Sequence, residues 1–143
     1  MKITAADVNK LRKQTGAGMM DCKNALVESE GNFENAVDIL RKKGQKIAAK
    51  RADRDAAEGC VLAQANADNS KGFIISLNCE TDFVGKNPAF QSLATDLTKL
   101  IESSDVENVD SLLSSELNGV KVEQVITEQV AKIGEKITPR RFV

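Results

Sequence analysis

An amphipathic helix that follows a pair of strands is the feature that most restricts the fold of this chain. Asn87 and Pro88 are typical of a helix N-cap and first helical position. Apolar residues then recur at i, i+3, i+4, i+7, i+10 and i+11, namely Phe90, Leu93, Ala94, Leu97, Leu100 and Ile101. Upstream, residues 60–66 and 73–79 predict an antiparallel hairpin whose loop is too long to fix the register. The apolar stripe of the helix is expected to cover one face of this sheet.

The first 43 residues predict three short helices. Thr4 and Asp7 form a capping-box-like start, and Gly16 stands where the first helix should end. A second helix is expected to begin at residues 19–21 and to end before Gly31. Asn32 is a suitable N-cap for a third, which is predicted to end at Gly44. About forty residues make only a small core, so we expect a bundle of the ubiquitin-associated type.

The rest of the chain predicts an α+β core behind a charged connection. Residues 45–58 are Ala-rich and highly charged, which indicates a solvated helical linker. After the amphipathic helix we expect a short helix over residues 110–117, a longer one over 122–133 that ends at Gly134, and a last strand over 136–143. Pro139 favours an edge position for that strand. The predicted organisation is a three-helix module at 1–44, the linker at 45–58 and an α+β core with an antiparallel sheet at 59–143.

Composition argues against several classes of function. Histidine is absent, which removes the commonest general base and metal ligand. Three cysteines without C-x-x-C spacing suggest neither a zinc site nor a disulfide framework, and no nucleotide-binding G-x-x-x-x-G-K-[ST] loop occurs. The chain is therefore expected to be no enzyme, and to hold no cofactor and no metal.

Charge and hydropathy argue against nucleic acid and membrane partners. The net charge is −1, from 20 basic and 21 acidic residues, and all five aromatic residues are Phe. Basic residues gather at 42–54, but Asp53, Asp55 and Glu58 lie among or just after them, as on an ordinary solvated helix face. No apolar run approaches membrane-spanning length and no targeting segment precedes the first helix pattern. We expect a soluble, cytoplasmic protein, and the sequence leaves its oligomeric state open.

The connection at residues 78–86 is the strongest candidate for a functional element. It should present a large apolar side chain, Phe83, together with two acids, Glu80 and Asp82, because connections between a strand and a helix run over the surface. A displayed Phe beside an acid is a candidate probe for a partner protein. The alternative is that Phe83 folds back as a lid on the local core, and position and composition favour neither.

Three segments in order resemble the elongation factor Ts family, the nucleotide-exchange factors for the translational GTPase elongation factor Tu. They are residues 79–84 (CETDFV), residues 11–26 (LRKQTGAGMMDCKNAL) and residues 131–137 (AKIGEKI) followed by Arg140 and Arg141. Together they extend over nearly the whole chain. Members of that family carry a second core half after this point, so we expect the chain to be a fragment or a natural truncation.

The resemblance implies which residues contact the GTPase. Phe83 would wedge between helices of elongation factor Tu, and Asp82 would disturb the magnesium region nearby, with Thr81 and Val84 orienting the turn. Two further sets match contact regions of the family: Arg12, Met19, Met20 and Lys23 in the helical module, and Ile133 and Gly134 near the end. Without the resemblance, Met19 and Met20 read as core gap-fillers, although consecutive methionines cannot both face one core, and Gly134 reads equally well as a helix C-cap.

Other classes of function remain as alternatives. The N-terminal bundle alone could serve as a ubiquitin-associated-like adaptor that binds a peptide or protein without exchange activity. An enzyme could use Cys79 with Glu80 or Asp82, although a base of suitable pKa is missing. A nucleic-acid-binding protein would show strongly salt-dependent binding. Exchange fits best, because a factor that displaces a nucleotide needs no reaction chemistry of its own.

Overall fold

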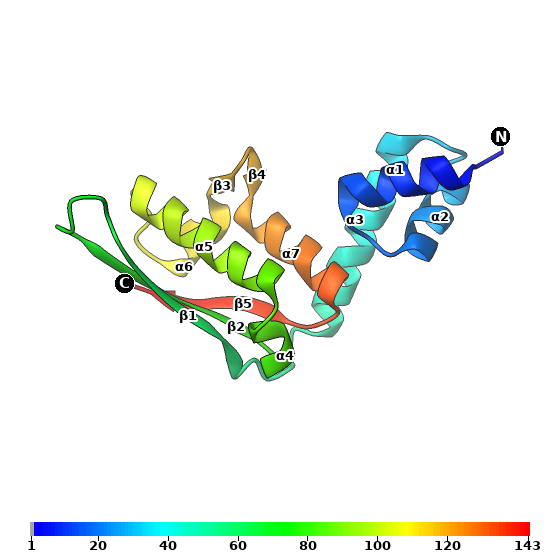
Figure 1. The fold of residues 1–143 in the computed structure, drawn as a ribbon. Helices are drawn as coiled ribbons and strands as arrows, with labels where there is room; N and C mark the ends of the chain where they lie inside the picture. The colour runs from blue at the N-terminus through cyan, green and yellow to red at the C-terminus, as the bar shows by residue number, and fades with distance from the viewer. Residues whose placement is uncertain (1) are drawn as a thin grey trace.

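A computed structural model describes residues 2–143 and shows an α+β architecture, as predicted. Met1, the first residue of the predicted 1–44 module, lies outside the described residues. The elements follow in the order α1 (Ala5–Thr15), α2 (Met19–Glu28), α3 (Phe33–Lys50), β1 (Glu58–Ala65), β2 (Gly72–Cys79), α4 (Asp82–Gly85), α5 (Pro88–Ser103), α6 (Val109–Ser114), β3 (Glu116–Leu117), β4 (Val120–Lys121), α7 (Val122–Ile133) and β5 (Ile137–Phe142). Figure 1 shows α1, α2 and the start of α3 gathered at the N-terminal end, beside the sheet and its helices.

The first three helices begin where their capping residues stand. The Thr4 side chain accepts a hydrogen bond from the Asp7 backbone N–H, and the Asp7 carboxylate accepts one from the Thr4 N–H, which completes the predicted capping box. Gly16 ends α1 in the left-handed conformation, and Asn32 caps α3. A small core joins these helices, formed by Val8, Leu11, Cys22, Ala25, Leu26 and Ala36. The predicted three-helix bundle is confirmed.

Helix α3 does not end at Gly44, so that prediction is wrong. Gly44 is buried against α7, and a Cβ built there would lie 3.2 Å from the Cβ of Ala131. This glycine permits close packing of two helices and leaves the backbone helical through Lys50. One turn later, Ile47 and Ala48 pack against the core around the sheet. The segment 45–58 is thus helical in its first part, as expected, but it is not fully solvated. The division into module, linker and core stays a prediction.

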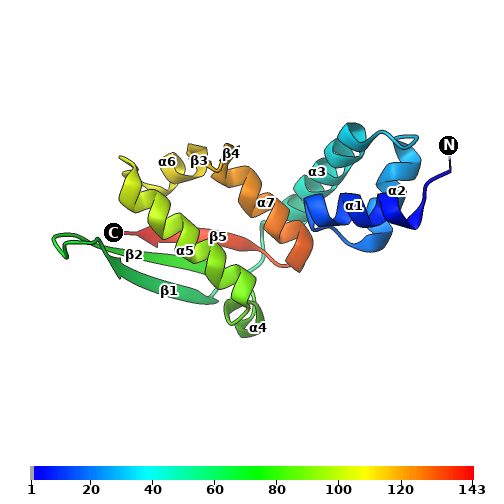
Figure 2. The same cartoon turned by 45° about the horizontal axis from the view of Figure 1, so that its top comes forward.

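The sheet has the strand order β1-β2-β5, and both pairs are antiparallel. The hairpin register pairs Glu58 with Cys79 and Ala65 with Gly72. Strand β5 lies at an edge, as Pro139 predicted, and its pairing with β2 skips one residue beside that proline. Figure 2 shows α5, α6 and α7 on one side of the sheet. Between them and the strands lies the main core, with Ile75, Leu77, Phe90, Leu97, Leu112, Val122 and Ile137 among its buried members.

A short hairpin replaces part of one predicted helix. The helix expected over 110–117 ends at Ser114, and Glu116–Leu117 pairs with Val120–Lys121. Asn118 and Gly119 connect these strands with φ values of 53° and 80°. An Asn-Gly pair with positive φ at both positions is the preferred two-residue hairpin loop, and this signal decided the local structure. Among residues 2–143, no helix is both long and apolar enough to cross a membrane.

Candidate functional site

The turn between β2 and α5 carries the most exposed aromatic side chain of the candidate site. Thr81 caps the short helix α4, and its hydroxyl accepts a hydrogen bond from the Val84 N–H at 3.5 Å. Phe83 follows with 82% of its surface exposed. The expectation that this ring is displayed is confirmed, and the alternative of a core lid is wrong. A Phe this exposed has no packing role within residues 2–143 that would explain its presence.

The rest of α4 is anchored on the sheet. Val84 is half-buried against the main core. Gly85 is buried, and a Cβ built on it would lie 2.8 Å from the Gly59 carbonyl oxygen in β1. Gly59 itself has φ of +140° and lies so close to β2 that a Cβ would meet the Leu77 carbonyl oxygen at 2.1 Å. Two glycines therefore permit the close approach that seats α4 on the strand end while Phe83 points away.

Asp82 stays available on the surface beside Phe83. Its carboxylate pairs with the Lys86 ammonium at 3.3 Å, one helical turn later, and both side chains are largely exposed. An exposed ion pair of this kind contributes little to stability and exchanges readily with other partners. The carboxylate can therefore be redirected to a cation or hydrogen-bond donor on another protein.

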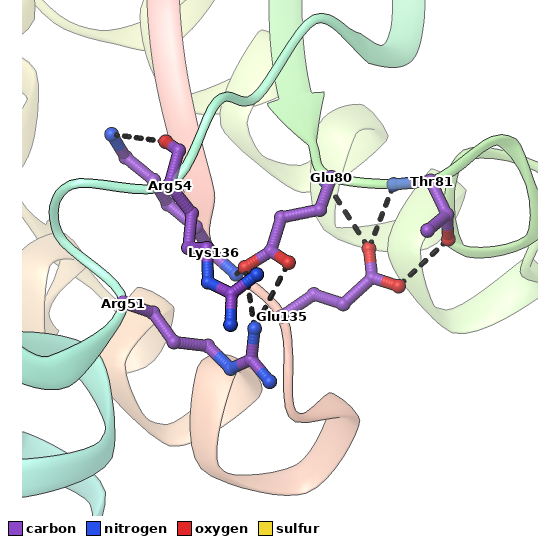
Figure 3. A network of polar contacts seen from close by, with 6 residues as sticks. All are labelled: Arg51, Arg54, Glu80, Thr81, Glu135 and Lys136. Carbon is purple, nitrogen blue, oxygen red and sulfur yellow. Dashed lines mark hydrogen bonds and ion pairs between the residues drawn. The ribbon is translucent and has the colours of Figure 1, made fainter.

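Glu80, the second acid of the turn, is not displayed, and that part of the prediction is wrong. Its carboxylate accepts hydrogen bonds from the Arg51 guanidinium at 2.9 and 3.0 Å and from the Lys136 backbone N–H at 2.8 Å (Figure 3). Burial raises the pKa of Glu80, but these hydrogen bonds and the positive charge of Arg51 outweigh it and hold the pKa below its ordinary value. Glu80 thereby connects the end of α3 to the segment just before β5.

Glu135 supports the same turn from the other side. Its Oε1 accepts from the backbone N–H groups of Glu80 at 3.1 Å and Thr81 at 2.9 Å, and its Oε2 accepts from the Thr81 hydroxyl at 2.7 Å (Figure 3). Sequence reasoning identified neither Glu135 nor the Glu80–Arg51 pair. Their partners lie 29 to 55 residues away in the chain, a distance at which no local pattern operates.

Ile133 and Gly134 lie on the segment that delivers Glu135 to the turn. Ile133 is half-buried against the core. Gly134 has φ of 80° and caps α7, donating its N–H to the Val130 carbonyl oxygen, so the C-cap interpretation is confirmed. The structure thus brings these two positions to the neighbourhood of Thr81 through Glu135.

Cys79 has the surroundings of a structural thiol. It is fully buried, and its Sγ donates to the Thr81 carbonyl oxygen at 3.1 Å. Burial, followed by the negative charge of Glu135, raises the pKa of Cys79 to about 11. A thiol with such a pKa is not a nucleophile near neutrality. Glu80, one of the two acids proposed to act with Cys79, is bound to Arg51.

The predicted contact residues of the helical module are exposed on α1 and α2. Met19 and Met20 expose 51% and 63% of their surface, so the interpretation as core gap-fillers is wrong for both. Arg12 and Lys23 are also exposed. Figures 1 and 2 show α2 and α4 at separate places on the molecule. The predicted site is therefore two surfaces, one on the module and one on the sheet end.

Comparison with known proteins identifies the chain's relatives. The family described as elongation factor TS matches residues 80–143. The chain is 58% identical to elongation factor Ts of Christiangramia forsetii over 95% of its own length and 49% of that protein. It is 53% identical to that of Campylobacter concisus over 99% of the chain and 40% of the relative, and 50% identical to that of Clostridium perfringens over 98% and 46%. The chain spans about half the length of the curated relatives it matches.

The chain is a translation-factor-like protein in which three N-terminal helices precede an α+β core, and the turn after β2 displays the exposed Phe83. The family match begins at that turn, at Glu80, and runs to the last residue. The chain is thus similar to elongation factor Ts over nearly all of its own length.

Proposed function

We propose that this chain promotes guanine-nucleotide exchange on elongation factor Tu, with Asp82 and Phe83 as the element that opens the nucleotide site. The observation that carries the proposal is Phe83, exposed on a turn whose other residues are anchored, in a chain similar to elongation factor Ts. The N-terminal surface around Arg12, Met19, Met20 and Lys23 would dock on a second region of the GTPase. Ile133 and Gly134 would contact it beside the turn. As a factor of translation, the chain would act in the cytoplasm.

Exchange follows from binding alone. A factor that binds the nucleotide-free GTPase more tightly than the nucleotide-bound form lowers the affinity of the GTPase for its nucleotide by the same ratio. The phosphates of a bound nucleotide are held by backbone N–H groups and by Mg²⁺, so a side chain that displaces nearby elements loosens both. Phe83 supplies the displacing group. The Asp82 carboxylate supplies a negative charge that interacts near the Mg²⁺ and disturbs the groups that surround the metal.

The exposed ring accounts for a useful share of the binding energy. Full burial of a Phe side chain is worth roughly 1.5 to 3 kcal/mol, or about one to two decades in affinity. Thr81 and Val84 would act by fixing the turn. No catalytic group of the chain is required, which agrees with the burial and raised pKa of Cys79.

The test is nucleotide release from elongation factor Tu. The purified GTPase is loaded with fluorescent GDP, the chain is added with excess unlabelled GDP, and the fluorescence decay is followed. Release should accelerate with chain concentration until it saturates. Release that stays at the spontaneous rate, at concentrations where the chain binds the nucleotide-free GTPase, would refute the exchange activity.

Exposed Met19, Met20 and Val27 on α2 support a second candidate, a protein-binding adaptor of the ubiquitin-associated type without exchange activity. In that case the segment 1–44 would capture the partner in a pull-down as well as the whole chain does. The whole chain would then leave the rate of nucleotide release unchanged.

A further inference from the structure

We propose that Glu135 is a positioning residue for exchange, which holds the turn so that Phe83 projects in a fixed direction. This inference rests on the proposed function, because a direction matters only if the ring enters a partner. Glu135 touches neither Asp82 nor Phe83 in the described hydrogen bonds; it acts through Thr81, the residue before them.

Both oxygens of the Glu135 carboxylate are engaged by this one turn. Both oxygens accept hydrogen bonds, two from consecutive backbone N–H groups and one from a hydroxyl, at 2.7 to 3.1 Å. A carboxylate that accepts hydrogen bonds from two successive N–H groups fixes the orientation of the peptide plane between Glu80 and Thr81 as well as the position of the backbone there. The next residue, Asp82, is the first of α4, so the start of that helix is oriented directly.

Glu135 is itself held in place. Gly134 turns the chain in the left-handed conformation after α7, and the Lys136 N–H on the far side of Glu135 donates to Glu80 at 2.8 Å. The two segments therefore bond in both directions. The Lys136 ammonium also donates to the carbonyl oxygens of Ala52 and Arg54 at 2.8 and 3.2 Å, which attaches the loop after α3 to the same point. Figure 3 shows the second of these two bonds.

The exposure of Phe83 explains why such a support is needed. An exposed ring has few contacts of its own to define its direction, so its placement depends on the backbone that carries it. A turn ordered before binding loses less entropy when the complex forms. Removing Glu135 leaves the Glu80 and Thr81 N–H groups without their acceptor and lets the turn sample other conformations.

The first measurement follows the turn in the free chain, by hydrogen exchange at the backbone amides of residues 80–86. Glu135→Ala should reduce protection of the Glu80 and Thr81 amides by about tenfold or more, while Glu135→Gln, whose amide oxygen still accepts, should retain most of it. Glu123→Ala, which removes an exposed acid from α7, is the matched control and should change nothing at the turn. Unchanged protection at residues 80–86 in Glu135→Ala would overturn the proposal.

The second measurement asks whether the effect passes through Phe83. Glu135→Ala should slow the maximal rate of GDP release from elongation factor Tu by about tenfold, with Glu135→Gln partly restoring it. In a Phe83→Leu background, the same substitution should have a much smaller effect on release but an undiminished effect on thermal stability. An equal effect in both backgrounds would mean that Glu135 serves the fold alone, and the positioning role would be wrong.

Two further controls keep the outcomes distinct. If Glu135→Ala does not fold, Thr81→Val removes one of the three hydrogen bonds to Glu135 together with the cap that accepts from the Val84 N–H, and Thr81→Ser restores both. The pair is tested in the same two ways, and protection of the Glu80 amide, which bonds Glu135 and not the Thr81 hydroxyl, is the readout for Glu135. If the unaltered chain releases no nucleotide, the proposed exchange function has failed, and a positioning role in exchange falls with it. The hydrogen-exchange result then shows only whether Glu135 orders the turn.

Discussion

Truncating Phe83 separates a role in mechanism from a role in folding. Less than a fifth of the side chain's surface is buried, whereas full burial of a Phe is worth roughly 1.5 to 3 kcal/mol. Phe83→Ala should therefore lower the free energy of unfolding by only about 0.5 kcal/mol. For a chain of this size that corresponds to a fall in melting temperature of roughly 1 to 3 °C.

The same substitution should have a large effect on exchange. Truncating a central interface aromatic commonly costs about 2 kcal/mol or more, which is more than a tenfold change in rate or affinity. Release of fluorescent GDP from elongation factor Tu should slow by more than tenfold, and Asp82→Ala should act in the same direction less strongly, because water can replace part of its polar contact.

A matched control is available on the sheet. Val61 exposes 70% of its surface on β1, and Val61→Ala removes a comparably exposed apolar group without touching the turn. It should leave both melting and release nearly unchanged. If Phe83→Ala instead lowered the melting temperature sharply while the folded protein still exchanged nucleotide normally, Phe83 would be a structural residue and the proposed mechanism would be wrong.

Three further outcomes are expected. Met20→Ala should weaken binding to elongation factor Tu by about 1 to 2 kcal/mol in a titration, with an unchanged circular dichroism spectrum, because the side chain is 63% exposed; loss of helical signal would instead make it a core residue. Glu80→Gln should destabilise the chain by about 1 to 3 kcal/mol at pH 7 by weakening the pair with Arg51. The folded pKa of Glu80 lies below its ordinary value of 4.5, so this stabilisation is present above pH 4.5 and is lost as the pH falls through the folded pKa. Denaturant titrations of the unaltered chain and of Glu80→Gln should therefore give converging stabilities in acid. A stability difference that persists there would contradict the assignment. Trypsin should cut first after Arg54, in the non-helical stretch, and not after Lys46 within α3; early cleavage at Lys46 would show that the helix frays there.

The sequence alone determined the local elements of this protein. Caps and terminators act within a few residues, so Thr4, Asn32 and Asn87 placed helix starts, and Gly16 and Gly134 placed helix ends. The apolar stripe of α5 and the two strand segments before it then predicted a sheet with this helix on one face. The α+β class and the antiparallel pairing followed from these signals.

Local signals failed where a residue served a distant neighbour. Gly44 looked like a helix end by its type, but it is the point at which α3 and α7 pack closely, and only the presence of α7 distinguishes the two. The exposure of Phe83, which sequence position left open, was decided by the seating of α4 on β1 through Gly85 and Gly59.

The support of the turn belongs entirely to the tertiary structure. Glu80 and Glu135 are both acids in short connections, and the sequence gives no reason for one to bind a guanidinium and the other to bind two backbone N–H groups. Their roles depend on the meeting of the end of α3, the end of β2 and the start of β5. Such a meeting is fixed by the packing of the whole core, because hydrogen bonds between distant segments form only after that packing brings the segments together.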